Sequence, residues 1–177
     1  YFINGNNAIV TDYMGEETGT LIVPDTLGGK PVTEIGHLGM VSCPAEYIKL
    51  PDSIEKIGVY AFQHCRNMKE LEYSTEKDIS FGAKAFNDCD GLETITFNKN
   101  IKKIPDAFFK NCESLTTVIA PGVTEIGDEA FLYCTALENV QFSDELHTIG
   151  KDSFNLCEKL KIIGVSGEKI TSLGAGA

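Results

Sequence analysis

The stretch 123–142, VTEIGDEAFLYCTALENVQF, carries the pattern that decides the fold. An IxxIG-like segment leads into AFxxC, and an LxxIxF-like segment completes the unit. The unit recurs along the chain, and one cysteine marks each copy: Cys43, Cys65, Cys89, Cys112, Cys134 and Cys157. The intervals between them are 22, 24, 23, 22 and 23 residues. A period this regular predicts a repeat protein with about six copies of one unit of 22–24 residues.

Other positions fall into register when the copies are aligned on their cysteines. An aromatic residue stands three positions before the cysteine in five copies: Phe62, Phe86, Phe109, Phe131 and Phe154. The upstream IxxIG pattern recurs at 32–36, 54–58, 123–127 and 146–150, and in a degraded form at 79–83 and 101–105. The consensus is therefore IxxIGxxAFxxCxxLxxIxF, in which the apolar positions recur and the positions between them vary.

The two halves of the unit favour different local structures. LxxIxF, as in LETITF at 92–97, ends in apolar and polar alternation and predicts a short β-strand. GxxAFxxC is too short for a stable isolated helix and predicts a single helical or 3-10 turn. A unit of this size cannot bury its apolar face alone. We therefore expect the copies to stack, with their strands about 4.8 Å apart in a parallel ladder.

The unit resembles the BspA-type, or Treponema-type, leucine-rich repeat, for which AFxxC followed by LxxI is specific. The resemblance covers roughly residues 20–174. Copy one departs from it at Gly39 and Met40, where Ala-Phe is expected, and copy four departs at 101–105. Pattern and resemblance together predict an α/β leucine-rich-repeat solenoid. We expect a right-handed superhelix with a parallel β-ladder on the concave face and short helical or 3-10 turns opposite.

The 177 residues are predicted to form one domain. It has three parts: an N-terminal cap and entry strand at 1–30, six repeats at 31–168, and the start of a truncated seventh repeat at 169–177. The cap is expected to be rich in β-structure, because FI at 2–3 and AIV at 8–10 flank an Asn-Gly turn. The chain begins at Tyr1 without a signal-peptide pattern, which we interpret as a mature or trimmed form.

The charge balance bears on the class of partner. The 26 acidic and 15 basic residues give a net charge of -11 at pH 7. Such a surface repels phosphate, which argues against nucleic acid and anionic membranes as partners. Solubility is the simpler explanation of the charge. No apolar stretch reaches the roughly 18 residues that a membrane span needs, so we expect no membrane insertion of this segment.

The six cysteines admit three interpretations. As a structural ladder of buried free thiols, they would pack as small apolar groups and bond weakly to turn backbone. Disulfides are less favoured, because parallel Cβ vectors in neighbouring copies suit their geometry poorly. Zinc is less favoured again, because the sequence has no CxxC or HxxxH ligand pairs. We therefore predict free thiols, with no metal and no other cofactor.

The histidines carry little sign of chemistry. His37, His64 and His147 fall at three different positions of the repeat. The side chain of His64 diverges from that of Cys65, so the pair does not predict a nucleophile and its base. Structural or surface roles are expected for all three histidines.

Acidic side chains offer two further candidates. Near one rim of the predicted ladder lie four glutamates: Glu46, Glu70, Glu72 and Glu93. They could form a cation site or a solvated acidic surface, and the second interpretation is favoured. Residues 87–90 resemble part of a calcium loop but lack its DxDxDG order. The GxSxG, HExxH, GxGxxG and GxxxxGK[ST] motifs are also missing from the sequence. We therefore predict no catalytic residues.

Outward positions on the strands form the candidate binding surface. The third and fifth residues of each LxxIxF segment point away from the core on the concave sheet. They are Tyr47, Lys49, Glu70, Glu72, Thr94, Thr96, Thr117, Ile119, Asn139, Gln141, Ile162 and Gly164. Solenoids commonly bind through such surfaces, so these residues are the candidate concave binding surface. The alternatives are the convex face, a lateral edge or a site outside this segment.

The sequence favours a binding or structural surface over an enzyme. The family resemblance implies a secreted or cell-surface bacterial protein and adhesion to a protein ligand, such as a host or extracellular-matrix protein. The alternative is a structural spacer that presents other domains at the cell envelope. The oligomeric state is left open.

Overall fold

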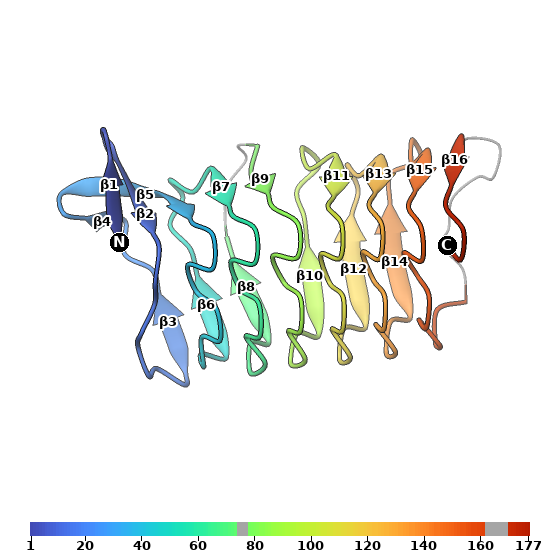
Figure 1. The fold of residues 1–177 in the computed structure, drawn as a ribbon, viewed down its shortest axis with the longest axis horizontal. Helices are drawn as coiled ribbons and strands as arrows, with labels where there is room; N and C mark the ends of the chain where they lie inside the picture. The colour runs from blue at the N-terminus through green and yellow to red at the C-terminus, as the bar shows by residue number, and fades with distance from the viewer. Residues whose placement is uncertain (74–77, 162–169) are drawn as a thin grey trace.

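The computed structural model describes residues 1–73, 78–161 and 170–177. The chain winds into an elongated solenoid, and successive repeats add strands to two rows that run along its length (Figure 1). Within these ranges, no helix has the length and apolarity that a membrane crossing requires.

The first row is built from the LxxIxF segments. Its strands are β3 (Thr20–Ile22), β6 (Tyr47–Lys49), β8 (Glu70–Glu72), β10 (Thr94–Thr96), β12 (Thr117–Ala120) and β14 (Asn139–Phe142). Pairing within the row is parallel and in register, so that Ile95 lies beside Val118 and Val118 beside Val140. Ile95 and Val118 are buried while their neighbours along the strand face outward. The alternation in LETITF therefore corresponds to a half-buried strand.

The second row is built from the IxxIG segments. Its strands are β5 (Lys30–Ile35), β7 (Lys56–Ile57), β9 (Ser80–Phe81), β11 (Lys103–Ile104), β13 (Glu125–Ile126), β15 (Thr148–Ile149) and β16 (Ser172–Leu173). The degraded copies at 79–83 and 101–105 contribute strands like the others. Most of these strands have only two residues, which is too short for alternation to reveal them in the sequence.

The N-terminal segment forms the hairpin that its sequence predicts. Strands β1 (Phe2–Asn4) and β2 (Asn7–Val10) pair antiparallel around Gly5, whose φ is 59°. Strand β2 then pairs parallel with β5, and the short β4 (Thr26–Leu27) pairs antiparallel with β5. The segment therefore extends the second row beyond the first IxxIG copy.

The predicted helical turn is wrong. None of the described residues is helical, so the fold is a β-solenoid rather than an α/β structure. Each GxxAFxxC segment holds two residues in the left-handed region, such as Tyr60 and His64 with φ of 58° and 60°. Left-handed residues cannot continue a right-handed helix. We call these segments the turn edge: 58–65, 82–89, 105–112, 127–134 and 150–157.

Backbone hydrogen bonds along the turn edge join each repeat to the next. The N–H groups of Tyr60, Phe62 and His64 donate to carbonyls 23 residues further along the chain, those of Ala83, Ala85 and Asn87. The same three bonds recur at the following copies, for example from Phe86 to Phe108 and from Phe109 to Ala130. Every second N–H thus points along the solenoid axis, which satisfies polar groups that a helix would bond internally.

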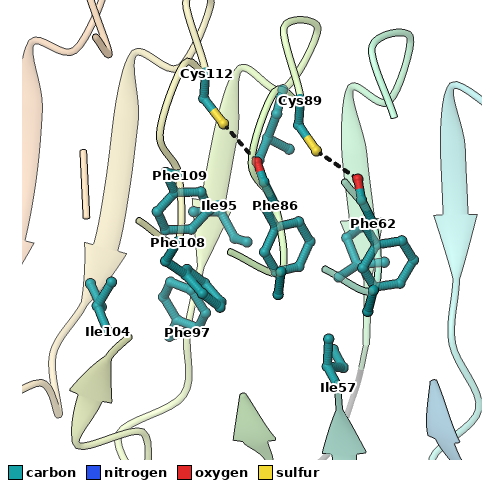
Figure 2. Close-up of a cluster of buried hydrophobic side chains, with 14 of the residues drawn as sticks. Ile57, Phe62, Phe86, Cys89, Ile95, Phe97, Ile104, Phe108, Phe109 and Cys112 are labelled. Carbon is teal, nitrogen blue, oxygen red and sulfur yellow. Dashed lines mark hydrogen bonds between the residues drawn. The ribbon is translucent and has the colours of Figure 1, made fainter. Parts of the chain in front are cut away.

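The core under the turn edge consists of two ladders of side chains (Figure 2). In the phenylalanine stack, the ring centroids of Phe62, Phe86, Phe109, Phe131 and Phe154 are 5.3, 5.7, 5.4 and 5.1 Å apart in turn. Beside it, each cysteine from the second copy on donates to a carbonyl of the preceding copy. The Sγ of Cys112, for example, lies 3.1 Å from the Phe86 oxygen. Both ladders persist although the cysteine interval varies between 22 and 24 residues, so the variation in length is taken up outside the turn edge.

The glycine of IxxIG is explained by close approach of neighbouring repeats. A Cβ on Gly58 would lie 2.7 Å from the Gly36 carbonyl carbon and 2.8 Å from the His37 nitrogen. No side chain fits at that separation from rigid backbone. The glycine therefore sets how tightly the second row can stack.

Neither row is one continuous ladder, and this corrects the expectation of a single ladder. The first row divides between β8 and β10, and the second divides between β9 and β11. The breaks are staggered, so the third repeat pairs backward through β9 and forward through β10. An aromatic cluster lies beside the second break, where the Phe81 ring is 5.6 Å from Phe97 and 5.5 Å from Phe108.

Candidate functional site

The outward side chains of the first row form one surface, which we call the strand face. It comprises Tyr47, Lys49, Glu70, Glu72, Thr94, Thr96, Thr117, Ile119, Asn139 and Gln141, and each is exposed or half-exposed. Because paired strands are parallel and in register, the first outward residue of each strand lies beside the first of the next, and the second beside the second. Ile162 and Gly164 of the predicted surface lie outside the described residues. The function of the strand face stays a prediction.

Charge is concentrated at the N-terminal end of the strand face. The Nζ of Lys49 lies 2.5 Å from Glu72, and the Nζ of Lys69 lies 2.7 Å from Glu46. Hydrogen bonds with these carboxylates raise the pKa of each lysine. All four side chains remain substantially exposed, so the pairs add little to stability and mainly shape the surface potential.

The C-terminal end of the strand face is neutral. From β10 onward its outward residues are threonine, isoleucine, asparagine and glutamine. Ile119 is half-buried between Thr96 and Gln141, its partners in the neighbouring strands. Uncharged hydrogen-bonding groups around one aliphatic side chain suit contact with another protein surface.

A hollow of about 710 Å³ lies over the break between β8 and β10. The predicted residues Tyr47, Glu70, Glu72, Glu93, Thr94 and Thr96 line it, together with Lys69, Leu71, Tyr73 and Ile95. A smaller hollow adjoins it beside Ile22 and Lys49. Sequence reasoning missed Tyr73 and Ile22, although one signal was available. Tyr73 belongs to the longest cysteine interval, the 24 residues from Cys65 to Cys89.

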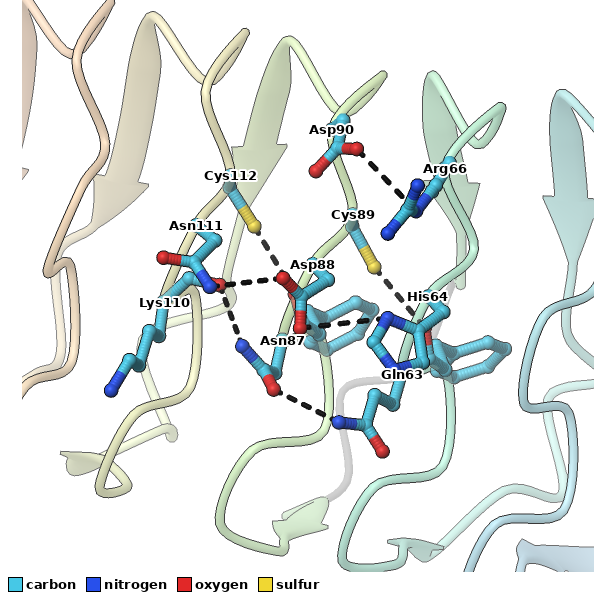
Figure 3. Close-up of polar contacts among 12 residues, drawn as sticks. Gln63, His64, Arg66, Asn87, Asp88, Cys89, Asp90, Lys110, Asn111 and Cys112 are labelled. Atoms are coloured by element: carbon cyan, nitrogen blue, oxygen red, sulfur yellow. Dashed lines mark hydrogen bonds and ion pairs between the residues drawn. The ribbon is translucent and has the colours of Figure 1, made fainter.

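The residues that resemble part of a calcium loop instead bond to neighbouring repeats (Figure 3). The Asn87 amide donates to the Lys110 carbonyl at 2.9 Å and accepts from Gln63 at 3.0 Å. The Asp88 carboxylate accepts from Asn111 at 2.9 Å. Asp90 pairs with Arg66 at 3.6 Å, which extends this polar network across the exposed side of the turn edge.

The histidines lie apart along the solenoid. The Nδ1 of His64 is 3.5 Å from the Asp88 carboxylate, and that of His37 is 3.0 Å from the Val59 oxygen. His147 contacts the neighbouring Thr148 hydroxyl at 3.0 Å. Over the ranges that the structure covers, no three His, Cys, Asp or Glu side chains gather in a way that could hold a metal ion.

The cysteines are all free thiols, five of them buried and Cys157 half-buried. Burial raises the pKa of Cys65 to about 12 and raises those of Cys89 and Cys134 as well. A thiol that holds its proton so firmly is a poor nucleophile and a poor metal ligand. This arrangement is consistent with the packing role proposed for the structural ladder.

These features define a leucine-rich-repeat β-solenoid with one surface of variable side chains. The family model for the BspA type leucine-rich repeat region matches residues 33–161 in six copies. The chain therefore belongs to the BspA-type leucine-rich-repeat family, whose repeats are typically non-catalytic. Among curated proteins, no sequence matches the chain.

Solved bacterial structures share the fold. The leucine-rich repeat protein of T. pallidum is 21% identical, with a TM-score of 0.68 over 97% of this chain and 92% of that one. A leucine-rich cell surface protein of Faecalibacterium prausnitzii is 23% identical, with a TM-score of 0.63 over 97% and 52%. The pneumococcal vaccine antigen PcpA is 21% identical, with a TM-score of 0.73 over 95% and 47%. The chain thus spans about half of the last two.

Proposed function

We propose that this chain is a non-catalytic protein-binding module of a secreted or cell-surface bacterial protein, and that it serves adhesion through its strand face. One observation carries the proposal. Inward positions of the first row are apolar in copy after copy, whereas the outward positions change in size, charge and polarity. A surface that packing leaves unconstrained can be adapted to one partner.

The structural neighbours support a secreted or cell-surface location. One of them is described as a cell surface protein and another as a vaccine antigen, and both resemble this chain in fold. The solenoid also offers a long, one-sided surface on a rigid core, which suits recognition of a folded protein. The partner that we expect is a host or extracellular-matrix protein.

An array of secreted, mucosal and matrix proteins, probed with this chain at physiological salt, tests the proposal. A ligand captured by the chain should be lost by Ile119→Arg, which places a charge in the neutral part of the strand face. The matched control is Leu173→Arg, because Leu173 is 66% exposed on β16 in the other row.

The possible outcomes distinguish a protein-binding module from a structural spacer. Loss of the ligand with Ile119→Arg alone supports the strand face as the binding surface. Equal loss with both variants places the contact elsewhere, and no captured protein at all favours the structural spacer. Melting curves of both variants exclude unfolding as the cause of a lost signal.

A further inference from the structure

The break in the first row, which we call the seam, exposes backbone groups that strands normally pair. No backbone hydrogen bond joins 69–73 to 93–97, and the structure describes both segments. The Glu70 N–H and the Glu72 carbonyl bond toward β6, so the N–H and carbonyl of Leu71 point toward β10. The opposite side of the seam presents the backbone of Thr94 and Thr96 in the same way.

Among the described residues, one side chain, that of Tyr73, bridges the seam, at one of its ends. The Tyr73 hydroxyl donates to the Thr96 carbonyl at 3.2 Å, where a backbone N–H would donate in a regular ladder. Tyr73 also packs edge-on against Phe81 at 6.4 Å, which anchors its ring. The rest of the seam lies beneath the 710 Å³ hollow, a size within the range of roughly 300–1,000 Å³ of ligand-binding clefts.

Charge around the hollow is unbalanced. Glu46 and Glu72 are each paired with a lysine, Lys69 and Lys49 respectively. Glu70 and Glu93 have no ion pair within 4 Å among the described residues, although both line the hollow. Four carboxylates therefore meet two ammonium groups, and the two carboxylates beside the seam are available to a cation.

The rim of the hollow can hold an aliphatic stem. Tyr47 is 42% exposed and lines both the main hollow and the smaller one beside it. Ile22, at 64% exposure, lies at the far side of the smaller hollow. A lysine or arginine side chain buries its methylene stem against such apolar surface and keeps its charged end beside a carboxylate or an aromatic face.

We propose that the seam is the docking site for an extended, basic peptide segment of the protein partner. A lysine or arginine of that segment binds beside Glu70 and Glu93, and its backbone bonds to groups that the seam leaves unpaired. This inference rests on the proposed function, since it names the chemistry of the partner on the strand face. Extended segments commonly bind to exposed strand edges in this manner.

The test uses three short synthetic peptides that alternate threonine with lysine, glutamine or glutamate. Fluorescence anisotropy with the whole chain should show binding of the lysine peptide, weakening as salt rises, and neither of the others. The double variant Glu70→Gln and Glu93→Gln should weaken binding by about tenfold or more. The matched control is Glu16→Gln with Glu113→Gln, which makes the same charge change at exposed positions away from the hollow.

Charge reversal provides the second arm. Glu70→Lys with Glu93→Lys should abolish binding of the lysine peptide and create affinity for the glutamate peptide. Equal affinity for the lysine and glutamine peptides, an equal loss in the control pair, or no binding of the lysine peptide overturns the inference. If a captured protein is lost with Ile119→Arg but unaffected by the Glu70 and Glu93 variants, the proposed function stands and the seam inference fails.

Discussion

The turn edge and the strand face belong to the same repeats but follow opposite rules. Along the turn edge, the second to the fifth copies share the same three backbone bonds, the same ring contact and the same thiol contact. Along the strand face, outward residues change from a lysine and glutamates to threonines and amides. The comparison indicates that stability is concentrated at the turn edge. The strand face can then vary without loss of the fold, as the binding role that we propose for it requires.

The largest expected effect is at the centre of the phenylalanine stack. Phe109 is fully buried and lies 5.7 Å from Phe86 and 5.4 Å from Phe131. Phe109→Ala leaves a cavity under two neighbouring rings and should lower the free energy of unfolding by about 3–5 kcal/mol in urea titrations. Thr94→Ala on the strand face should change it by less than about 0.5 kcal/mol. A similar loss in the free energy of unfolding for both variants would contradict the view that stability is concentrated at the turn edge.

A second prediction concerns the close stacking at Gly58. Gly58→Ala drives a methyl group into the backbone of the preceding repeat and should cost up to about 3 kcal/mol. Gly19→Ala is the matched control, because no atom lies within 4 Å of the added Cβ there. Thermal unfolding of both variants measures the difference. A cost at Gly58 no larger than at Gly19 would mean that the repeats can separate without penalty.

The buried thiols predict a dependence of stability on alkaline pH. Burial raises the pKa of Cys65 to about 12, whereas the pKa of a thiol in an unfolded chain is about 8.5. The contribution of the protonated, buried thiol to the free energy of unfolding is therefore fully present below the pKa of the unfolded chain. It is lost as pH rises toward the folded pKa, because only the unfolded chain releases the proton. Each such thiol lowers the free energy of unfolding by up to about 1.4 kcal/mol per pH unit in this window.

Urea titrations between about pH 8 and pH 11 compare the wild-type chain with Cys65→Ala. The variant should show a shallower loss of stability with pH, by the contribution of one thiol. Identical slopes would show that Cys65 ionises as readily in the folded chain as in the unfolded one. A thiol assay of denatured, unreduced protein checks the premise, which requires close to six free thiols.

The repeat and the inward positions could be predicted well from the sequence, because a regular period of 22–24 residues and the alternation along the strands are both visible in it. It does not predict the left-handed backbone, since Tyr60, Lys84 and Leu156 are not residue types that mark such conformations. The helical prediction failed for this reason. The residues of the strand face could be assigned one by one from LxxIxF. Tyr73 could not be assigned to the hollow, because its place in LxxIxF is an inward one and only the structure shows its hydroxyl on Thr96.

The breaks between sheets were also beyond the sequence pattern. Phe81 departs from the IxxIG pattern and Phe108 departs from the alanine of AFxxC, and each looks like decay of the repeat when considered alone. In the folded chain, their rings meet at 5.5 Å beside the break between β9 and β11. Two irregular copies thus compensate each other through a contact that only the three-dimensional stacking creates.

The smallest effect concerns Ser153, which occupies the position of Ala61, Ala85 and Ala130 in other copies. Its side chain is fully buried, and its Oγ has no hydrogen-bond partner within the described part of the chain. Ser153→Ala should therefore raise the free energy of unfolding by about 1 kcal/mol, because it removes an unsatisfied polar atom from the turn edge. Ser53→Ala is the control with the opposite sign, since the Ser53 hydroxyl donates to the Val32 carbonyl at 2.7 Å. If both changes destabilise the chain, Ser153 has a partner that the repeat pattern hides. Stabilisation by Ser153→Ala alone would show that the alanine found in other copies suits this buried position better than serine, by the cost of one unpaired oxygen atom.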